Sequence, residues 1–205
     1  MGTGHSSPQL NHPMGLLSKK NQGAVAGGSG GGYLNPSKIQ SGSSVRFALL
    51  TDNPLEFYEC WGEDKDGKAK PFRFKDDPSP SEVEAEMGPN YERRLNRDGT
   101  DVDPAKFAMA APVYNFENGN VQVMSLTQKG LIREIDKLSQ MEDYKDILAW
   151  DFVLEKEGTG LNTSYSLRIV PPRNRKIIEE AWAKSCDEGF DINRLMTGGN
   201  PFKRD

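Results

Sequence analysis

The spacing of hydrophobic residues changes within one stretch of this chain, residues 110–138. As far as Leu126, apolar and polar residues alternate as they do in strands; after Thr127 the apolar residues recur at helical spacing, at Leu131, Ile132, Ile135 and Leu138. Asn118-Gly119 separates two alternating halves, and Asn-Gly favours a hairpin because its turn positions adopt positive φ. The stretch therefore predicts a β-hairpin followed directly by an amphipathic helix, with Thr127 as N-cap.

Further alternating segments flank this unit. We expect strands over Ser44–Leu50, Leu55–Trp61, Ala69–Lys75, Trp150–Glu157 and Asn162–Val170, and a last helix over Arg175–Cys186. Several strands, one helix and a final hairpin is the order of an OB-fold, whose helix lies between its third and fourth strands. We therefore predict a mainly β protein with two or three helices: an OB-fold, a five-stranded Greek-key barrel with an insertion and flexible termini.

The 205 residues are enough for one domain with appendages. Residues 1–32 are Gly-rich and predict a flexible N-terminal arm. Residues 33–173 hold the expected OB-fold, interrupted at about 76–106 by a long polar insertion with a short helix near Ser81–Met87. Residues 174–205 form a C-terminal helix and tail.

Composition excludes several classes of function. The chain has 26 basic and 30 acidic residues, so its net charge of -4 argues against a wholly basic coat for duplex DNA, although not against one basic groove. Cys60 and Cys186 lie far apart with no histidine near either, which argues against a zinc site. We find no phosphate-binding loop, nucleophile elbow or metal cluster, and expect no enzyme activity, cofactor or metal. No apolar run approaches the roughly 20 residues that span a bilayer, so we expect a soluble, intracellular protein.

Aromatic and basic residues occur together on the expected strands. Single-stranded nucleic acid requires this mixture, because aromatic faces stack bases at about 1–3 kcal/mol each while cations follow the phosphates. Our candidate nucleic-acid-binding residues are Arg46, Tyr58, Trp61, Phe72, Arg73, Lys75, Tyr114, Phe116, Lys129 and Arg168. Alternate aromatic residues on a strand are more often core. Phe72 and Phe74 share one face of their strand, so both are core if Arg73 faces the groove.

Three quoted segments resemble the single-stranded DNA-binding proteins of tailed phages, distantly similar to the phage T4 helix-destabilising type. They are "YLNPSKIQSGSSVRFALL", "APVYNFENGNVQVMSLTQKGLIREIDKL" and "DFVLEKEGTGLNTSYSLRIVPP", within Tyr33 to Pro172. The resemblance implies an OB-fold and sequence-independent binding of single strands in phage replication, recombination and repair, in the cytoplasm of the infected bacterial host. The T4 type has a zinc subdomain, but this chain lacks ligands for one; residues 76–106 occupy about that place.

The resemblance also implies partners. A basic N-terminal segment mediates contacts between neighbours in the T4 type, and Lys19 and Lys20 match it here, so we expect cooperative self-association along DNA. Proteins of this kind usually end in a strongly acidic tail, whereas this chain ends in Lys203 and Arg204 before its last residue. Pro201 and Phe202 resemble the Pro-Phe tip with which bacterial single-strand binders dock into replication and recombination proteins.

Two other classes of function stay open on the sequence. One is an OB-fold protein-interaction module that holds a peptide or partner subunit in its groove, which the net acidity favours a little. The other is a magnesium-dependent nuclease that uses Asp151 and Glu155, although two carboxylates at strand spacing more often form a solvated face.

Overall fold

The computed structural model describes residues 32–202, so the arm around Lys19 and Lys20 lies outside the described residues. One mixed sheet contains nine strands: β1 (Tyr33–Leu34), β2 (Ser43–Leu49), β3 (Leu55–Asp64), β4 (Ala69–Phe74), β5 (Tyr91–Arg93), β6 (Lys106–Asn115), β7 (Asn120–Leu126), β8 (Asp151–Glu157) and β9 (Ser164–Val170). The described α-helices are α2 (Pro80–Met87), α3 (Lys129–Gln140) and α4 (Arg175–Asp187). Short 3-10 turns include η1 (Pro36–Lys38), η4 (Ile147–Ala149) and η6 (Ile192–Thr197). No helix in residues 32–202 is long and apolar enough to cross a membrane.

The main path of the sheet runs β1-β7-β6-β2-β8-β9, and β3 branches from β6 to pair also with β4 and β5. The prediction of a mainly β fold is confirmed, but the five-stranded barrel is corrected: the sheet has nine strands and does not close. Two features explain the difference. β1 pairs in parallel with β7 and occupies its outer edge, through Tyr33↔Val123 and Leu34↔Met124. The insertion contributes β5, and β4 and β5 both pair with β3 and extend the sheet outward along it.

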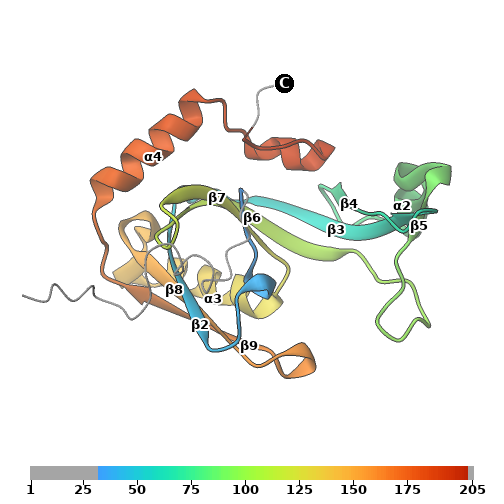
Figure 1. Cartoon of the computed structure of the whole chain (residues 1–205), viewed down its shortest axis with the longest axis horizontal. Helices are drawn as coiled ribbons and strands as arrows, with labels where there is room; N and C mark the ends of the chain where they lie inside the picture. The colour runs from blue at the N-terminus through green and yellow to red at the C-terminus, as the bar shows by residue number, and fades with distance from the viewer. Residues whose placement is uncertain (1–31, 203–205) are drawn as a thin grey trace, which may run out of the picture.

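β2 and β3 share one neighbouring strand, β6. Both pair with β6 in antiparallel register, β2 through Phe47↔Asn115 and β3 through Leu55↔Ala110. The turn between them is held where the Leu50 amide donates to the Pro112 carbonyl, at 3.1 Å. This bend directs the far half of β3 away from the core (Figure 1).

The main core lies inside the curved sheet and is covered on one side by α3. Phe47 and Phe152 stack at its centre, with ring centroids 5.4 Å apart, and both are fully buried. Leu131 and Ile135 of α3 are buried against this cluster and Leu138 packs at its margin, which confirms the predicted helical face. Thr127 is not the N-cap: the helix begins at Lys129, and Gln128 holds the cap position without a capping side-chain bond. In the hairpin before it, Gly119 has positive φ and Asn118 does not.

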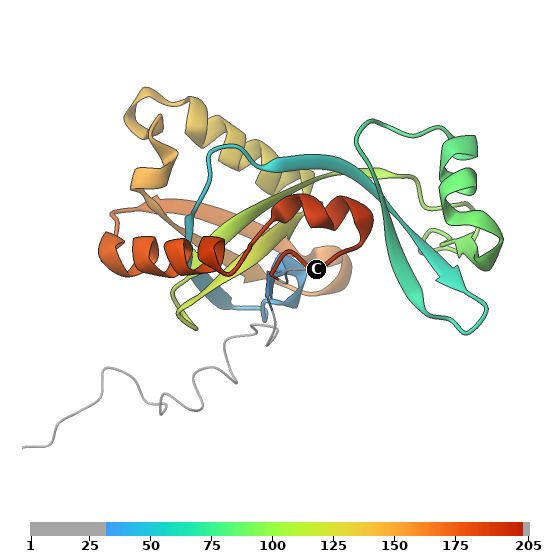
Figure 2. The ribbon, with the colours of Figure 1, turned by 90° about the horizontal axis from the view of Figure 1, so that it is seen from above.

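A second apolar layer covers the outer face of β3, β6 and β7. Phe57, Ala108, Ala110 and Val123 of the sheet are buried there against Leu195 of η6. Figure 2 shows the C-terminal segment, in red, lying across this face. β6 is therefore buried on both faces, so its sequence does not alternate cleanly.

The insertion and the far half of β3 form an arm that projects from the core (Figures 1 and 2). Cys60, Phe72, Val83 and Met87 make a separate small core in it. The short helix predicted near Ser81–Met87 is present as α2, which begins at Pro80; Ser79 is its N-cap, and the side chains of Ser79 and Glu82 form a reciprocal capping box. The arm thus begins earlier than residues 76–106, because β4 packs with the insertion and not with the main core.

Candidate nucleic-acid interface

A groove of about 450 Å³ lies where the arm meets the core. Residues from β1, η1, β3, β4, β6, β7 and η6 line it, together with the connections after β5 and β7. Those with aromatic, cationic or amide side chains are Tyr33, Asn35, Trp61, Arg73, Arg94, Lys106 and Gln128. The groove therefore depends on segments from almost the whole length of the described chain.

Glu59 holds the indole of Trp61 and the guanidinium of Arg73 in fixed positions. Glu59 and Trp61 lie on the same face of β3, and Arg73 is the direct partner of Glu59 on β4. Trp61 Nε1 donates to Glu59 Oε1 at 3.1 Å, and Arg73 Nε donates to Glu59 Oε2 at 2.9 Å. The Glu59 side chain is 9% exposed, so its charge is compensated within the protein. Trp61 stays 37% exposed and offers part of its ring to the groove.

Two further cations lie near Trp61, and both form exposed ion pairs. Arg94 places its guanidinium carbon 5.8 Å from the centre of the Trp61 ring and contacts Glu63 at 2.8 Å. Lys106 contacts Asp103 at 2.9 Å. The side chains of Arg94 and Lys106 are 46% and 50% exposed. Exposed pairs contribute about 0–1 kcal/mol each, so these cations can exchange a carboxylate for a phosphate at small cost.

Tyr33 supplies a second partly exposed ring, at the β1 edge of the groove. Burial raises the pKa of its phenol, and the nearby Arg73 partly offsets this. The hydroxyl therefore stays protonated at neutral pH. Two aromatic faces and three cations, set against the carboxylates of Glu59 and Asp103, give a groove that can stack flat rings and pair with anions.

The structure brings together a few of the residues predicted from the sequence. Trp61 and Arg73 line the groove, and Lys129 follows the groove residue Gln128 in the chain. Phe72 is buried in the arm. The sequence predicted a core position for Phe72 if its neighbour Arg73 faces the groove, and Arg73 does line the groove. Tyr58 lies on the opposite face of β3 from Trp61 and packs edge-on against Phe107, at 5.6 Å.

Other predicted residues lie elsewhere. Arg46 binds the buried carboxylate of Asp151, at 2.7 Å, and Tyr114 is buried beneath α4 with Phe116 packed beside it. Arg168 on β9 faces Glu155 at 3.8 Å. Lys75, the last of the candidate nucleic-acid-binding residues, is exposed just after β4.

Asp151 is fully buried and accepts from the side chains of Arg46 and Arg175 and from the Arg173 amide. This carboxylate joins β2, β8 and the start of α4. Within residues 32–202, no three His, Cys, Asp or Glu side chains gather closely enough to hold a metal ion.

Pro201 and Phe202, predicted to bind partners, pack within the molecule. Pro201 is buried, and the Phe202 ring lies 5.2 Å from Phe190 and 6.5 Å from Tyr33. Docking of these two residues into a partner would require this segment to leave the sheet.

Sequence reasoning did not select Tyr33, Arg94 or Lys106. Arg94 belongs to the basic cluster Arg93, Arg94 and Arg97 of the insertion, which was a visible signal. Its position became clear only from the pairing of β5 with β3, which sets the Arg94 amide 2.9 Å from the Trp61 carbonyl. Comparisons of this chain with protein-family models, curated proteins and solved structures find no match.

Proposed function

We propose that this protein binds single-stranded DNA without sequence specificity, in the groove between the arm and the core. The observation that carries the proposal is the Trp61 ring: it is partly exposed, held at its edge by Glu59 and flanked by Arg94. A fixed aromatic face accepts any base, and adjacent cations neutralise the phosphates on either side. The net charge of -4 is no obstacle, because local charge decides such binding.

An OB-type core is part of this proposal. β2, β6, β7, β8 and β9 pair in the order β7-β6-β2-β8-β9, and α3 lies between the third and fourth of them along the chain. An OB-fold has the same position for its helix and is a partly open barrel. α3 also contacts both β7 and β9, the two ends of that order. The helix therefore bridges β7 and β9, which do not pair with each other.

The resemblance to tailed-phage proteins extends the proposal to a biological role. We place the protein in the cytoplasm of an infected bacterium, coating strands exposed in replication, recombination and repair. Other copies of the chain and the phage replication and recombination proteins are the proposed partners.

The test is anisotropy of a labelled oligo-dT titrated with the full chain, compared with a duplex of equal length at several salt concentrations. We expect the single strand to bind more tightly and the affinity to fall with salt. Trp61→Ala should weaken binding about 5- to 150-fold, which corresponds to one stacked base at roughly 1–3 kcal/mol. Arg94→Ala should reduce the salt slope by about 0.7 if it contacts one phosphate.

Trp150→Ala is the matched control, because Trp150 packs against Tyr144 outside the groove. Circular dichroism verifies that each variant is folded. Absence of oligo-dT binding at low salt would refute the proposal. Equal affinities of the Trp61 and Trp150 variants would move the site away from this groove.

A further inference from the structure

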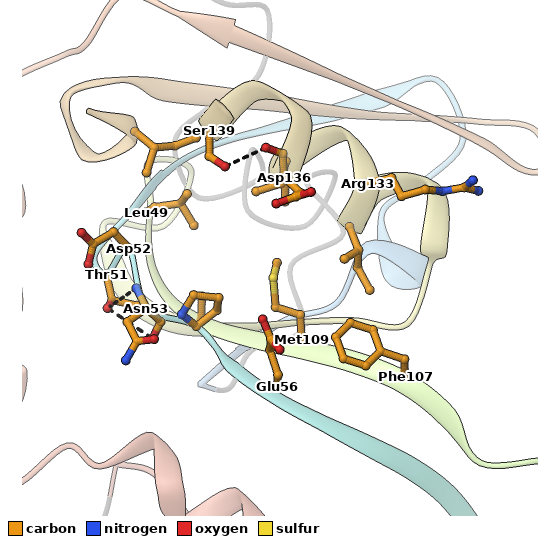
Figure 3. Close-up of a pocket in the computed structure, with 15 residues that line it drawn as sticks. Leu49, Thr51, Asp52, Asn53, Glu56, Phe107, Met109, Arg133, Asp136 and Ser139 are labelled. Atoms are coloured by element: carbon orange, nitrogen blue, oxygen red, sulfur yellow. Dashed lines mark hydrogen bonds between the residues drawn. The ribbon is translucent and has the colours of Figure 1, made fainter. Parts of the chain in front are cut away.

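A second hollow, of about 500 Å³, lies on the other side of β6 from the C-terminal segment, between α3 and the bend that joins β2 to β3. Its floor is apolar: Leu49, Met109 and Ile135 line it, with Phe107 at one side. Figure 3 shows Phe107 and Met109 across the hollow from α3. A volume of this size is typical of a site for a small ligand.

Two carboxylates lie on opposite sides of this apolar floor. Glu56 belongs to β3 and lies beside Met109, whereas Asp136 belongs to α3 on the far side of the hollow (Figure 3). Both residues are exposed, and within residues 32–202 neither forms an ion pair. Asp136 accepts one side-chain hydrogen bond, from Gln140 at 2.9 Å. The two negative charges are therefore available to cations.

The cation among the described residues that line the hollow does not compensate these acids. Arg133 Nε donates to the Lys129 carbonyl at 3.3 Å, and Figure 3 shows the Arg133 side chain directed away from the hollow. Asp52 adds a third carboxylate at the margin. The hollow thus combines an apolar floor with negative charge on two sides, which is complementary to a ligand that carries a positive charge at each end of an apolar chain.

We propose that this hollow binds a linear aliphatic polyamine. The methylene chain of the ligand covers the floor at Phe107 and Met109, and its ammonium groups pair with Glu56 at one end and Asp136 at the other. A polyamine has this arrangement of charge, because an alkylammonium group has a pKa of about 10.4 and stays charged at neutral pH, while the methylenes between the charges are apolar. A metal ion does not fit, since no three His, Cys, Asp or Glu side chains gather in the part of the chain that the structure describes.

The polyamine site is separate from the groove proposed for single strands. Trp61 and Arg94 line that groove, and neither of them lines the hollow. β6 contributes Lys106 to the groove and Met109 to the hollow, and these two residues point to opposite faces of the strand. Binding of a polyamine therefore requires no residue of the groove, and the two proposals can fail independently.

The test is isothermal titration calorimetry of the full chain without nucleic acid, at low ionic strength, where salt screens the carboxylates least. The probes are trimethylenediamine, hexamethylenediamine and hexylamine. We expect hexamethylenediamine to bind most tightly, with an affinity about two- to fourfold higher for each methylene that it has beyond trimethylenediamine, because each one covers more of the apolar floor. Hexylamine has the same six carbons but one charge, so it should bind about two- to fivefold more weakly than hexamethylenediamine.

Variants of the two carboxylates test the ends of the site. Glu56→Gln and Asp136→Asn should each lower the affinity for hexamethylenediamine about two- to fivefold, as expected for the loss of one exposed ion pair. Glu179→Gln is the matched control, because it removes one exposed carboxylate from α4, outside the hollow. We expect this control to bind the diamine as the wild type does. Circular dichroism verifies that each variant is folded.

Methionine methyl resonances locate the bound amine. Met109 lies in the hollow and Met87 lies in the core of the arm. In protein labelled at the methionine methyls, hexamethylenediamine should shift the Met109 signal, assigned with Met109→Leu, and leave the Met87 signal unchanged. The proposal is overturned if hexamethylenediamine does not bind, if the Met109 signal does not move, or if the two diamines bind equally, which would indicate charge attraction alone. It is also overturned if Glu179→Gln loses as much affinity as Glu56→Gln.

Discussion

Removal of the Asp151 carboxylate should destabilise the protein far more than removal of a similar carboxylate on the same strand. Asp151 and Glu155 both lie on β8 and both face an arginine. Asp151 is fully buried and accepts four hydrogen bonds at 2.7–3.0 Å, from Arg46, Arg173 and Arg175. Glu155 is 36% exposed, and its arginine is 62% exposed at 3.8 Å.

The magnitude follows from what Asp151→Ala would leave behind. Removal of one partner of a buried ion pair costs about 3–5 kcal/mol, because the other charge stays buried and unpaired. Arg46 and Arg175 are 17% and 27% exposed, so water compensates them in part. Arg46 also keeps its bond to the Pro171 carbonyl. We therefore expect Asp151→Ala to lower the free energy of unfolding by the lower limit of this range, about 3 kcal/mol. For a chain of this size, that corresponds to a fall in Tm of roughly 6–12 °C. Glu155→Ala should cost about 0–1 kcal/mol.

Urea unfolding of the two variants measures both free energies. Limited proteolysis gives a second reading, since Asp151 holds the start of α4 and its loss should make the chain cleave more readily after Pro171. The reasoning is refuted if the two substitutions cost the same within about 0.5 kcal/mol. It is also refuted if Asp151→Ala unfolds globally without earlier release of the C-terminal segment.

Two further predictions concern titratable groups. Cys186 is exposed and Cys60 is buried in the arm, and burial raises the pKa of both thiols. We expect a thiol reagent to modify Cys186 first and Cys60 at least about tenfold more slowly, at the rate at which the arm opens; equal rates would show that the arm core is not formed. Burial also raises the pKa of Tyr33, so the folded state holds this proton more tightly than the unfolded chain. The stability that this proton contributes is fully present below about pH 10 and is lost as the pH rises towards the folded pKa. Tyr33→Phe should therefore flatten the decline of the unfolding free energy above about pH 10. An unchanged slope would contradict this prediction.

Local patterns were sufficient wherever one face of an element meets one environment. The face of α3 that contains Leu131 and Ile135 was predicted because a single core covers it. The short helix near Ser81–Met87 was predicted from a serine that precedes acids, and the Ser79–Glu82 capping box that starts α2 is complete within four residues. The parity argument for Phe72 and Arg73 was also correct, since the ring is core and the cation lines the groove. In each case the sequence signal lies within a few residues of the chain.

Prediction failed where segments distant in sequence share a surface. Ala108 and Ala110 are buried together with Leu195, which lies at least 85 residues further along the chain and leaves no periodic signal in β6. Arg46 was a candidate nucleic-acid contact because it is a cation on an expected strand, but the pairing of β2 with β8 brings it to Asp151. Likewise, the number of strands depended on β1 reaching the edge of β7, which two residues cannot indicate by themselves.

The sequence by itself determined every strand except β1 and β5, together with the α-helices and their order, because hydrophobic periodicity and caps act over one or two turns of chain. It also determined that aromatic and basic residues would be available for binding. Only the tertiary structure decided which of them share a groove, because side chains meet there through strand pairings between distant residues. It placed Trp61 beside Arg94 and buried Tyr114 under α4.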